Sequence, residues 1–123
     1  MSRFMFVTWD GAGNQPPAFG LGEELRARGH AVHFAGYASQ QARIIARGFP
    51  FRLLERSQAV LLERLGGDFW SLLIESMWVC PAQLEEVPRA VAGEDGTVLV
   101  VDCMMFGALA AAERARVPAA VLV

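Results

Sequence analysis

Lysine is absent from this chain of 123 residues, so all eleven of its basic residues are arginines. This absence excludes the phosphate-binding Gly-Lys-Ser or Gly-Lys-Thr loop, which needs its lysine to contact the phosphates. A large excess of one charge sign is also lacking, because the formal net charge is only −2. No overall field therefore draws the chain to nucleic acid or to an anionic membrane surface.

Cysteine is scarce, and the two that occur, Cys80 and Cys103, have neither metal-ligand nor Cys-x-x-Cys spacing. We expect reduced thiols in a cytoplasmic protein and no metal site. The longest apolar stretch, Val98–Ala112, contains Asp102 and is shorter than the roughly 20 residues of a membrane-spanning helix. The N-terminal apolar run Phe4–Trp9 is too short for a signal peptide. We therefore expect no membrane span.

Hydrophobic residues are abundant, at 54%, which is enough to cover both faces of a parallel sheet. Short apolar runs typical of buried strands alternate with stretches of helical spacing. The expected strands are Phe4–Thr8, Ala31–Ala35, Phe49–Leu53, Thr97–Val101 and Ala119–Val123. The expected helices are Pro16–Gly29, Gln40–Arg47, Ser57–Gly66, Phe69–Val79, Ala82–Ala92 and Phe106–Arg116, with Ser39 and Asp68 as caps of the second and fourth. This alternation predicts one α/β domain over residues 1–123, a Rossmann-like doubly wound parallel sheet of order 3-2-1-4-5.

Such sheets bind ligands beyond the carboxyl ends of their strands, where the strand order reverses. Here the reversal lies between the first and fourth strands, which are followed by Trp9–Asn14 and by Asp102–Met105. We expect Asp10 and Asp102 to face one crevice, with one of them as a general base. The alternative is that Asp10 caps a turn and Asp102 caps the helix after the fourth strand. Gly11 and Gly13 would let a ligand approach the backbone of the first loop closely.

The two glycines of this first loop also suggest a dinucleotide-binding fingerprint, but the third glycine is missing, because Pro16 stands in its place. No acidic residue ends the second strand, where Gly36 follows Ala35. A standalone flavodoxin-like module that binds a nucleotide or a flavin remains the alternative hypothesis. His30 and His33 lie at the amino end and in the interior of the second strand, and we expect both to be structural.

The segment Phe69–Val79 is unusually rich in large apolar side chains. Trp70, Met77 and Trp78 share one face at helical spacing, which is typical of core packing or of the lining of an apolar ligand site. Three residues after the fourth strand extend the second possibility: Met104, Met105 and Phe106.

Several segments together resemble family 1 glycosyltransferases. The segments that carry the resemblance are Phe4–Trp9, Asn14–Pro17, Leu21–Val32, Val100–Asp102 and Gly107–Val121. It covers nearly the whole chain except for the middle, about residues 57–88. The resemblance implies a GT-B enzyme with two Rossmann-like domains, of which this chain is the N-terminal, acceptor-binding one. The C-terminal, donor-binding domain would be absent, so the chain is expected to be a piece of a longer protein and inactive alone.

The resemblance also implies the reaction. An inverting transferase would move a sugar from a nucleotide-sugar donor to a hydroxyl of a hydrophobic acceptor, without a further cofactor. Actinobacterial members of the family act in natural-product and antibiotic biosynthesis. The expected partners are therefore two small molecules and no nucleic acid. We also expect possible self-association of the chain through its last strand, which would form an unprotected sheet edge.

One position departs from the family pattern. The family's base is a histidine in the first loop, and Asn14 occupies that position. A carboxamide cannot take up a proton at neutral pH. The family pairs its histidine with an aspartate after the fourth strand, which Asp102 matches. We therefore expect Asp10 to act as base with Asp102 nearby; an acceptor that needs no base, or an impaired enzyme, are the alternatives. The residues expected to bind the acceptor are Trp9, Gly11, Gly13, Asn14, Trp70, Met77, Trp78, Met104, Met105 and Phe106.

Overall fold

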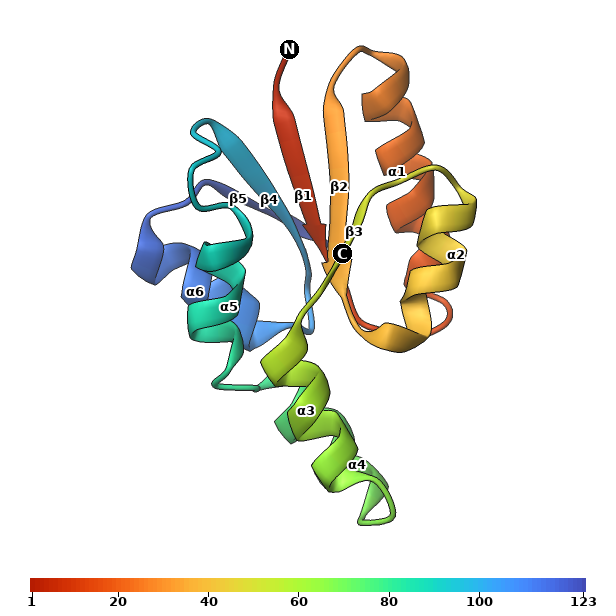
Figure 1. Cartoon of the computed structure of the whole chain (residues 1–123), viewed down its shortest axis with the longest axis vertical. Coiled ribbons are helices and arrows are strands. Elements are labelled where there is room, and N and C mark those ends of the chain that lie inside the picture. Colours follow the sequence, from red (N-terminus) through yellow and green to blue (C-terminus); the bar gives the residue numbers. More distant parts are fainter.

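A parallel sheet of five strands forms the centre of the molecule (Figure 1), in a computed structural model that describes residues 1–123. The strands are β1 (Arg3–Val7), β2 (Ala31–Gly36), β3 (Phe51–Leu53), β4 (Thr97–Asp102) and β5 (Ala119–Leu122). Their order is β3-β2-β1-β4-β5, and every neighbouring pair is parallel. The predicted α/β class and strand order are therefore confirmed.

Helices cover both faces of the sheet, as the abundance of apolar residues requires. They are α1 (Gln15–Ala27), α2 (Gln41–Ala46), α3 (Glu55–Arg64), α4 (Phe69–Leu73), α5 (Gln83–Ala90) and α6 (Phe106–Ala115). Figure 1 shows α1 and α2 on one side of the sheet and α5 and α6 on the other. None of these helices is long and apolar enough to cross a bilayer.

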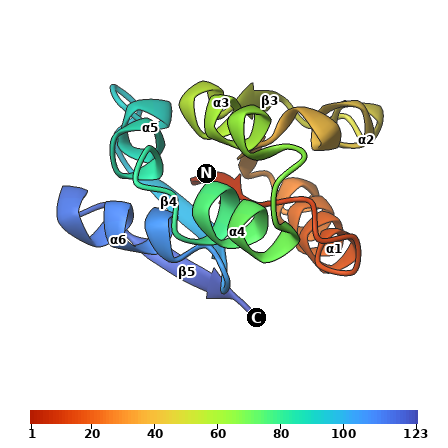
Figure 2. The same cartoon turned by 90° about the horizontal axis from the view of Figure 1, so that it is seen from below.

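A helical arm, residues 55–78, projects beyond the carboxyl ends of the strands. It consists of α3, α4 and the turn that follows α4, and it hangs below the sheet in Figure 1. Seen from below, α4 lies in front of the strand ends, between α1 and α6 (Figure 2). The arm therefore stands at the edge of the sheet where α/β proteins bind ligands.

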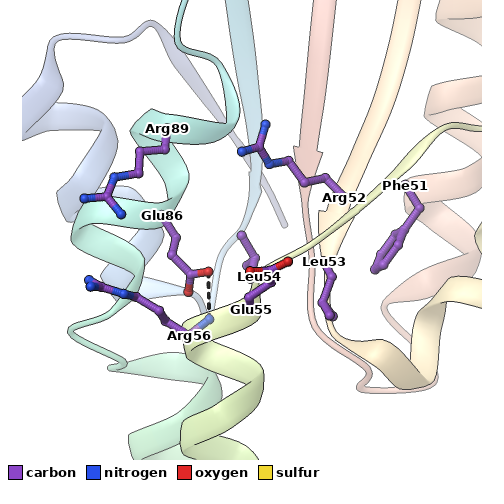
Figure 3. Close-up of a pocket in the computed structure, with 8 residues that line it drawn as sticks. All are labelled: Phe51, Arg52, Leu53, Leu54, Glu55, Arg56, Glu86 and Arg89. Carbon is purple, nitrogen blue, oxygen red and sulfur yellow. Dashed lines mark hydrogen bonds between the residues drawn. The ribbon is translucent and has the colours of Figure 1, made fainter.

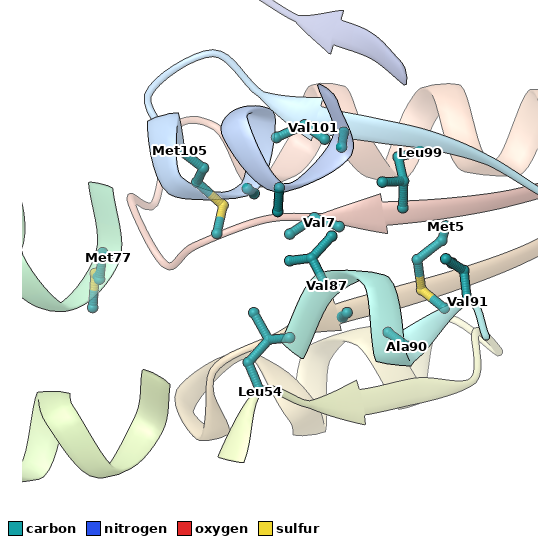
Figure 4. Close-up of a cluster of buried hydrophobic side chains, with 14 of the residues drawn as sticks. Met5, Val7, Leu54, Met77, Val87, Ala90, Val91, Leu99, Val101 and Met105 are labelled. Carbon is teal, nitrogen blue, oxygen red and sulfur yellow. The ribbon is translucent and has the colours of Figure 1, made fainter. Parts of the chain in front are cut away.

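Side chains at alternating positions of the strands pack into two separate cores, one on each face of the sheet. Met5 and Val7 of β1 pack with Leu99 and Val101 of β4 under α5 and α6 (Figure 4). Phe6, between them in the sequence, points to the opposite face and belongs to the core under α1 and α2. This alternation follows from the period of two in a strand, and it places apolar residues at successive positions of β1.

Two helix starts test the expected caps. Asp68 does cap α4, because its carboxylate accepts a hydrogen bond from the Ser71 N–H at 2.9 Å. Ser39 was expected to cap α2, and this prediction is wrong. The residue lies in a short 3-10 turn, Ala38–Gln40, and α2 begins at Gln41. The turn forms because the buried Gln40 side chain accepts a hydrogen bond from the backbone N–H of Tyr37 at 2.6 Å.

The helix expected over Phe69–Val79 is present over Phe69–Trp78, but it is not α-helical throughout. α4 ends at Leu73, and a π-helical turn spans Ile74–Trp78. Pro81 offers no N–H to the carbonyl of Met77, so an α-helical hydrogen bond is impossible there. The wider turn changes the direction of the side chains that follow it. Trp70 is consequently 60% exposed while Met77 is 8% exposed, so the two do not share a face as expected.

Two buried polar side chains hold the π-helical turn. The Tyr37 hydroxyl donates a hydrogen bond to the carbonyl of Ser76. Gln83 Nε2 donates to the Tyr37 hydroxyl at 3.0 Å and to the carbonyl of Met77 at 2.9 Å. Burial raises the pKa of Tyr37 well above its ordinary value, so the hydroxyl keeps the proton that it donates. The arm is thus tied to the end of β2 and to α5.

Two glycines provide a matched test of packing. A Cβ on Gly36 would lie 2.8 Å from the backbone oxygen of Thr8 and would meet the Gln40 amide, whereas nothing lies within 4 Å of a Cβ on Gly20 in α1. We expect Gly36→Ala to lower the free energy of unfolding by about 2 kcal/mol through overpacking. Gly20→Ala should raise it by about 1 kcal/mol, because alanine favours the helix. Urea unfolding followed by circular dichroism measures both, and equal effects would contradict the close approach at Gly36.

Candidate functional site

The loops after β1 and β4 meet at the carboxyl end of the sheet. Val7 and Val101 are partners in the β1–β4 register, so the residues after them are brought side by side. Trp9 Nε1 donates a hydrogen bond to Asp102 Oδ1 at 3.0 Å. The structure therefore joins two residues that are 93 positions apart and that the sequence had placed on one rim.

Asn14 completes this contact. Its Nδ2 donates to the carbonyl of Trp9 at 2.9 Å and to Asp102 Oδ2 at 3.0 Å. Its Oδ1 accepts a hydrogen bond from the backbone N–H of Gly11 at 3.0 Å. The side chain that replaces the histidine of the resembling family thus does contact the expected aspartate. It bridges the two loops as a donor and cannot serve as a base.

Asp102 accepts a third hydrogen bond, from the backbone N–H of Met104 at 2.9 Å. Only 4% of Asp102 is exposed, because the indole of Trp9 and the amide of Asn14 lie against its two oxygens. This geometry suits a residue that orients its neighbours, and the bond to Met104 also turns the chain toward α6.

Asp10 has a different partner. Its Oδ2 lies 2.8 Å from Arg43 Nη2 of α2, and the two side chains form a partly exposed ion pair. No hydrogen bond joins Asp10 to Asp102. The positive charge of Arg43 fixes the Asp10 carboxylate at the mouth of the site on the side of α2. Nothing in the sequence pattern singled out Arg43, because the pair depends on how α2 packs beside the first loop.

An apolar cavity of about 440 Å³ lies between the first loop and the arm. Its lining residues are Trp9, Asp10, Gly11, Ala12, Phe69, Leu72, Leu73 and Met77. Phe69, Leu72 and Leu73 were not among the residues expected at the site, although their spacing of three and four residues is the signal of one helix face. Trp78 packs edge-on against Trp9, with ring centroids 5.6 Å apart, and supports the wall of the cavity.

A second cavity of about 300 Å³ adjoins Asp102. It is lined by Trp9, Gly13, Asn14, Pro17, Asp102, Cys103, Met104, Leu122 and Val123. Trp9 lines both cavities, whereas Asp10 lines only the apolar one and Asp102 only the second. The remaining residues expected at the site line neither. Trp70 is exposed on the arm, Met105 is buried in the core under α5 and α6, and Phe106 is half-exposed at the start of α6.

A polar cavity of about 440 Å³ lies elsewhere, between the end of β3, α3 and α5 (Figure 3). It shares no lining residue with the two cavities beside Trp9. Two of its charged side chains have partners in the surrounding elements: Glu86 accepts from the backbone N–H of Arg56 at 2.9 Å, and the Arg56 guanidinium pairs with Glu85 at 2.7 Å. We interpret this cavity as the junction that fixes the arm to α5. No three side chains of the chain are grouped to hold a metal ion.

Comparison with known proteins gives a likeness in structure alone. No family model and no curated protein matches the sequence. Two similar solved structures are the glycosyltransferase of kitacinnamycin, with a TM-score of 0.67, and the calicheamicin glycosyltransferase, with a TM-score of 0.65. Both are 18% identical to this chain over 98% of its length. The chain has the fold of these glycosyltransferases.

This likeness confirms the expected fold, a Rossmann-like half of the GT-B fold. The chain spans 30% of the length of the first glycosyltransferase chain and 32% of the second. A sequence identity of 18% shows a shared fold, whereas function depends on the residues of the site.

A histidine at position 14 would test the contact with Asp102. In Asn14→His the imidazole should lie beside the Asp102 carboxylate, which favours the protonated ring and raises the pKa of the histidine above about 6.5. Because the folded-state pKa is raised, the ring stabilises the fold below its ordinary pKa and loses this effect as the pH rises through the raised one. Histidine NMR titration measures the pKa, with Asn14→His/Asp102→Asn as control. An unchanged pKa in the single variant would contradict the contact.

Proposed function

We propose that residues 1–123 form the N-terminal, acceptor-binding domain of an inverting glycosyltransferase. The enzyme would transfer a sugar from a nucleotide-sugar donor to a hydroxyl of a hydrophobic natural product, as in antibiotic biosynthesis in the cytoplasm. The donor would be bound mainly by a C-terminal domain outside these residues, so this chain alone would be inactive. The fold shared with two glycosyltransferases supports this proposal.

The observation that carries the proposal is the apolar cavity beside Trp9. Its volume of about 440 Å³ suits one small molecule, since such sites measure roughly 300–1,000 Å³. Apolar side chains of the arm supply half of its lining residues, and Asp10 and Gly11 supply polar groups at one side. This combination suits an acceptor with a flat apolar body and a hydroxyl, because the body would pack on Trp9 and Met77 while the hydroxyl faces Asp10.

The proposed roles follow from these contacts. Asp10 would accept the proton of the acceptor hydroxyl, held in place by Arg43. The acceptor oxygen would then attack the anomeric carbon of the donor sugar. The bond from that carbon to the nucleoside diphosphate would break, so the diphosphate leaves and the configuration inverts. Asp102 would orient Trp9 and Asn14 around the acceptor.

The flavodoxin-like alternative is not favoured. A flavin or nucleotide phosphate at the first loop would need free backbone N–H groups. The N–H of Gly11 already donates to Asn14 Oδ1, and the N–H of Gln15 donates to the carbonyl of Ala12 at 3.1 Å. The two neighbours in structure named above are glycosyltransferases.

Filling the apolar cavity should block acceptor binding. We expect the chain to bind a fused-ring aromatic alcohol such as 2-naphthol, with heat detectable by isothermal titration calorimetry. Leu72→Trp places a larger ring in the cavity wall and should weaken binding at least tenfold, about 1.4 kcal/mol. Leu62→Trp is the matched control, because Leu62 is exposed on the same arm and lines no cavity described above.

Flavin mononucleotide and nucleotide sugars serve as competing ligands in the same titration. The proposal expects no flavin binding to this chain and at most weak binding of the nucleotide sugar. Flavin binding with a yellow colour would support the flavodoxin-like module instead. Equal binding of the aromatic alcohol by the two tryptophan variants would place the acceptor elsewhere.

The role of Asp10 has its own test, in a form of the protein that also carries a donor-binding domain. Asp10→Asn keeps the size of the side chain and removes the base, so kcat should fall by at least about 100-fold while KM changes little. Glu24→Gln, at an exposed position on α1, is the control. Steady-state kinetics with one acceptor measures both, and an unchanged rate in Asp10→Asn would remove the base assignment while leaving acceptor binding intact.

A further inference from the structure

Four polar side chains of the protein interior form one hydrogen-bonded group, the buried polar network: Gln15, Gln40, Tyr37 and Gln83. At most 2% of each residue is exposed, and none of the four lines the apolar cavity. The two ends of the network nevertheless bond to Trp9 and Met77, which do line it. The network therefore connects the cavity wall formed by the first loop with the wall formed by the arm.

One end of the network lies at the first loop. Gln15 Nε2 donates to the carbonyl of Trp9 at 2.8 Å, and Gln15 Oε1 accepts from Gln40 Nε2 at 3.3 Å. Gln40 Nε2 also donates to the hydroxyl of Thr8 at 2.8 Å. Gln40 Oε1 accepts from the backbone N–H of Tyr37 at 2.6 Å. The position of Tyr37, directly after β2, is thus tied to the residues that follow β1.

The other end of the network lies in the π-helical turn of the arm. The Tyr37 hydroxyl donates to the carbonyl of Ser76, and Gln83 Nε2 donates to that hydroxyl at 3.0 Å. Gln83 Nε2 also donates to the carbonyl of Met77 at 2.9 Å, to which Pro81 offers no N–H. Such turns occur frequently at functional sites. Two carbonyls of this turn are held by the network, which therefore fixes the backbone that carries the Met77 side chain.

Stability alone does not account for a polar network at this place. A hydrogen bond inside a protein replaces bonds to water, so its net contribution to folding is modest, and apolar side chains of the same shape can serve as well. What hydrogen bonds add is direction, because each donor has to point at its acceptor. Fixed directions matter most behind a binding site, where the side chains that touch a ligand need support from the residues around them.

We propose that Tyr37 is a positioning residue for the acceptor, which holds Met77 against the bound molecule through the buried polar network. This inference rests on the proposed acceptor site, and Tyr37 itself does not touch the ligand. Removing the Tyr37 hydroxyl leaves the carbonyl of Ser76 without this donor and takes one acceptor from Gln83. The turn can then move, and Met77 packs less closely on a bound ring.

The first experiment is a double-mutant cycle on the binding of 2-naphthol, measured by isothermal titration calorimetry. Tyr37→Phe should weaken binding about fivefold in the otherwise unchanged chain but less than about twofold in a Met77→Ala background, because the contact that the hydroxyl positions is already lost there. Phe69→Ala is the matched background, since Phe69 also lines the cavity but lies at the start of α4, outside the network. Tyr37→Phe should keep its full effect in that background.

The second experiment reads the network without a ligand, by NMR of isotope-labelled methionine methyl groups. Tyr37→Phe and Gln40→Leu should both shift the methyl resonance of Met77, although Gln40 bonds only to the far side of Tyr37. Gln41→Leu is the matched control, because Gln41 is the next residue in the sequence but is exposed, and it should leave this resonance in place. Gln40→Leu also replaces Tyr37→Phe in the binding cycle if the latter variant does not fold.

Three results would overturn the proposal. Equal weakening by Tyr37→Phe in all three backgrounds would show that the hydroxyl acts on the whole fold and not through Met77. Unchanged binding in Tyr37→Phe, or an unmoved Met77 resonance in Gln40→Leu, would show that the network does not hold this side chain. A failure of the unchanged chain to bind 2-naphthol would remove the proposed acceptor site itself, and the NMR measurement would still show whether the network fixes Met77.

Discussion

The candidate site depends on the hydrogen bonds that the carboxylate of Asp102 accepts. It ends β4, and its two oxygens receive the indole N–H of Trp9 and the amide of Asn14 from the other loop. These bonds fix the first loop against the second, and they set the orientation of the one aromatic ring that lines both cavities. Parallel pairing of β1 with β4 makes this possible, since it brings the two strand ends to the same level of the sheet.

A second anchor governs the opposite wall of the apolar cavity. Tyr37 leaves the end of β2 and bonds to the backbone of the π-helical turn, with Gln83 holding both. Met77 reaches the cavity because the chain changes its helical register just before that residue. The two walls thus rest on different strands, one on β1 and β4 and the other on β2, while the sheet keeps them in a fixed relation.

The sequence predicted the sheet well because each strand is an apolar run between clear turn residues. Strand order followed from the helices between the strands and from the right-handed connections that they require. Asp102 and Asn14 could be placed together because both follow strands that meet at the point of reversal. The π-helical turn could not be predicted, since it depends on Pro81 together with two distant side chains, Tyr37 and Gln83. The Asp10–Arg43 pair escaped prediction for a related reason, because no spacing within the sequence links the first loop to α2.

Because the arm projects beyond the sheet, the residues that shape the cavity on α4 are different from those that set the register of the strands. α4 contributes Phe69, Leu72 and Leu73 to the cavity and belongs to no strand or sheet-covering helix. A substitution on its cavity side changes the shape offered to a small molecule and leaves the β-sheet register as it is. Phe69 and Leu72 belong to neither core, so substitutions at these two positions can alter the cavity while both cores stay as they are. New ligand preferences can therefore arise on an unchanged scaffold.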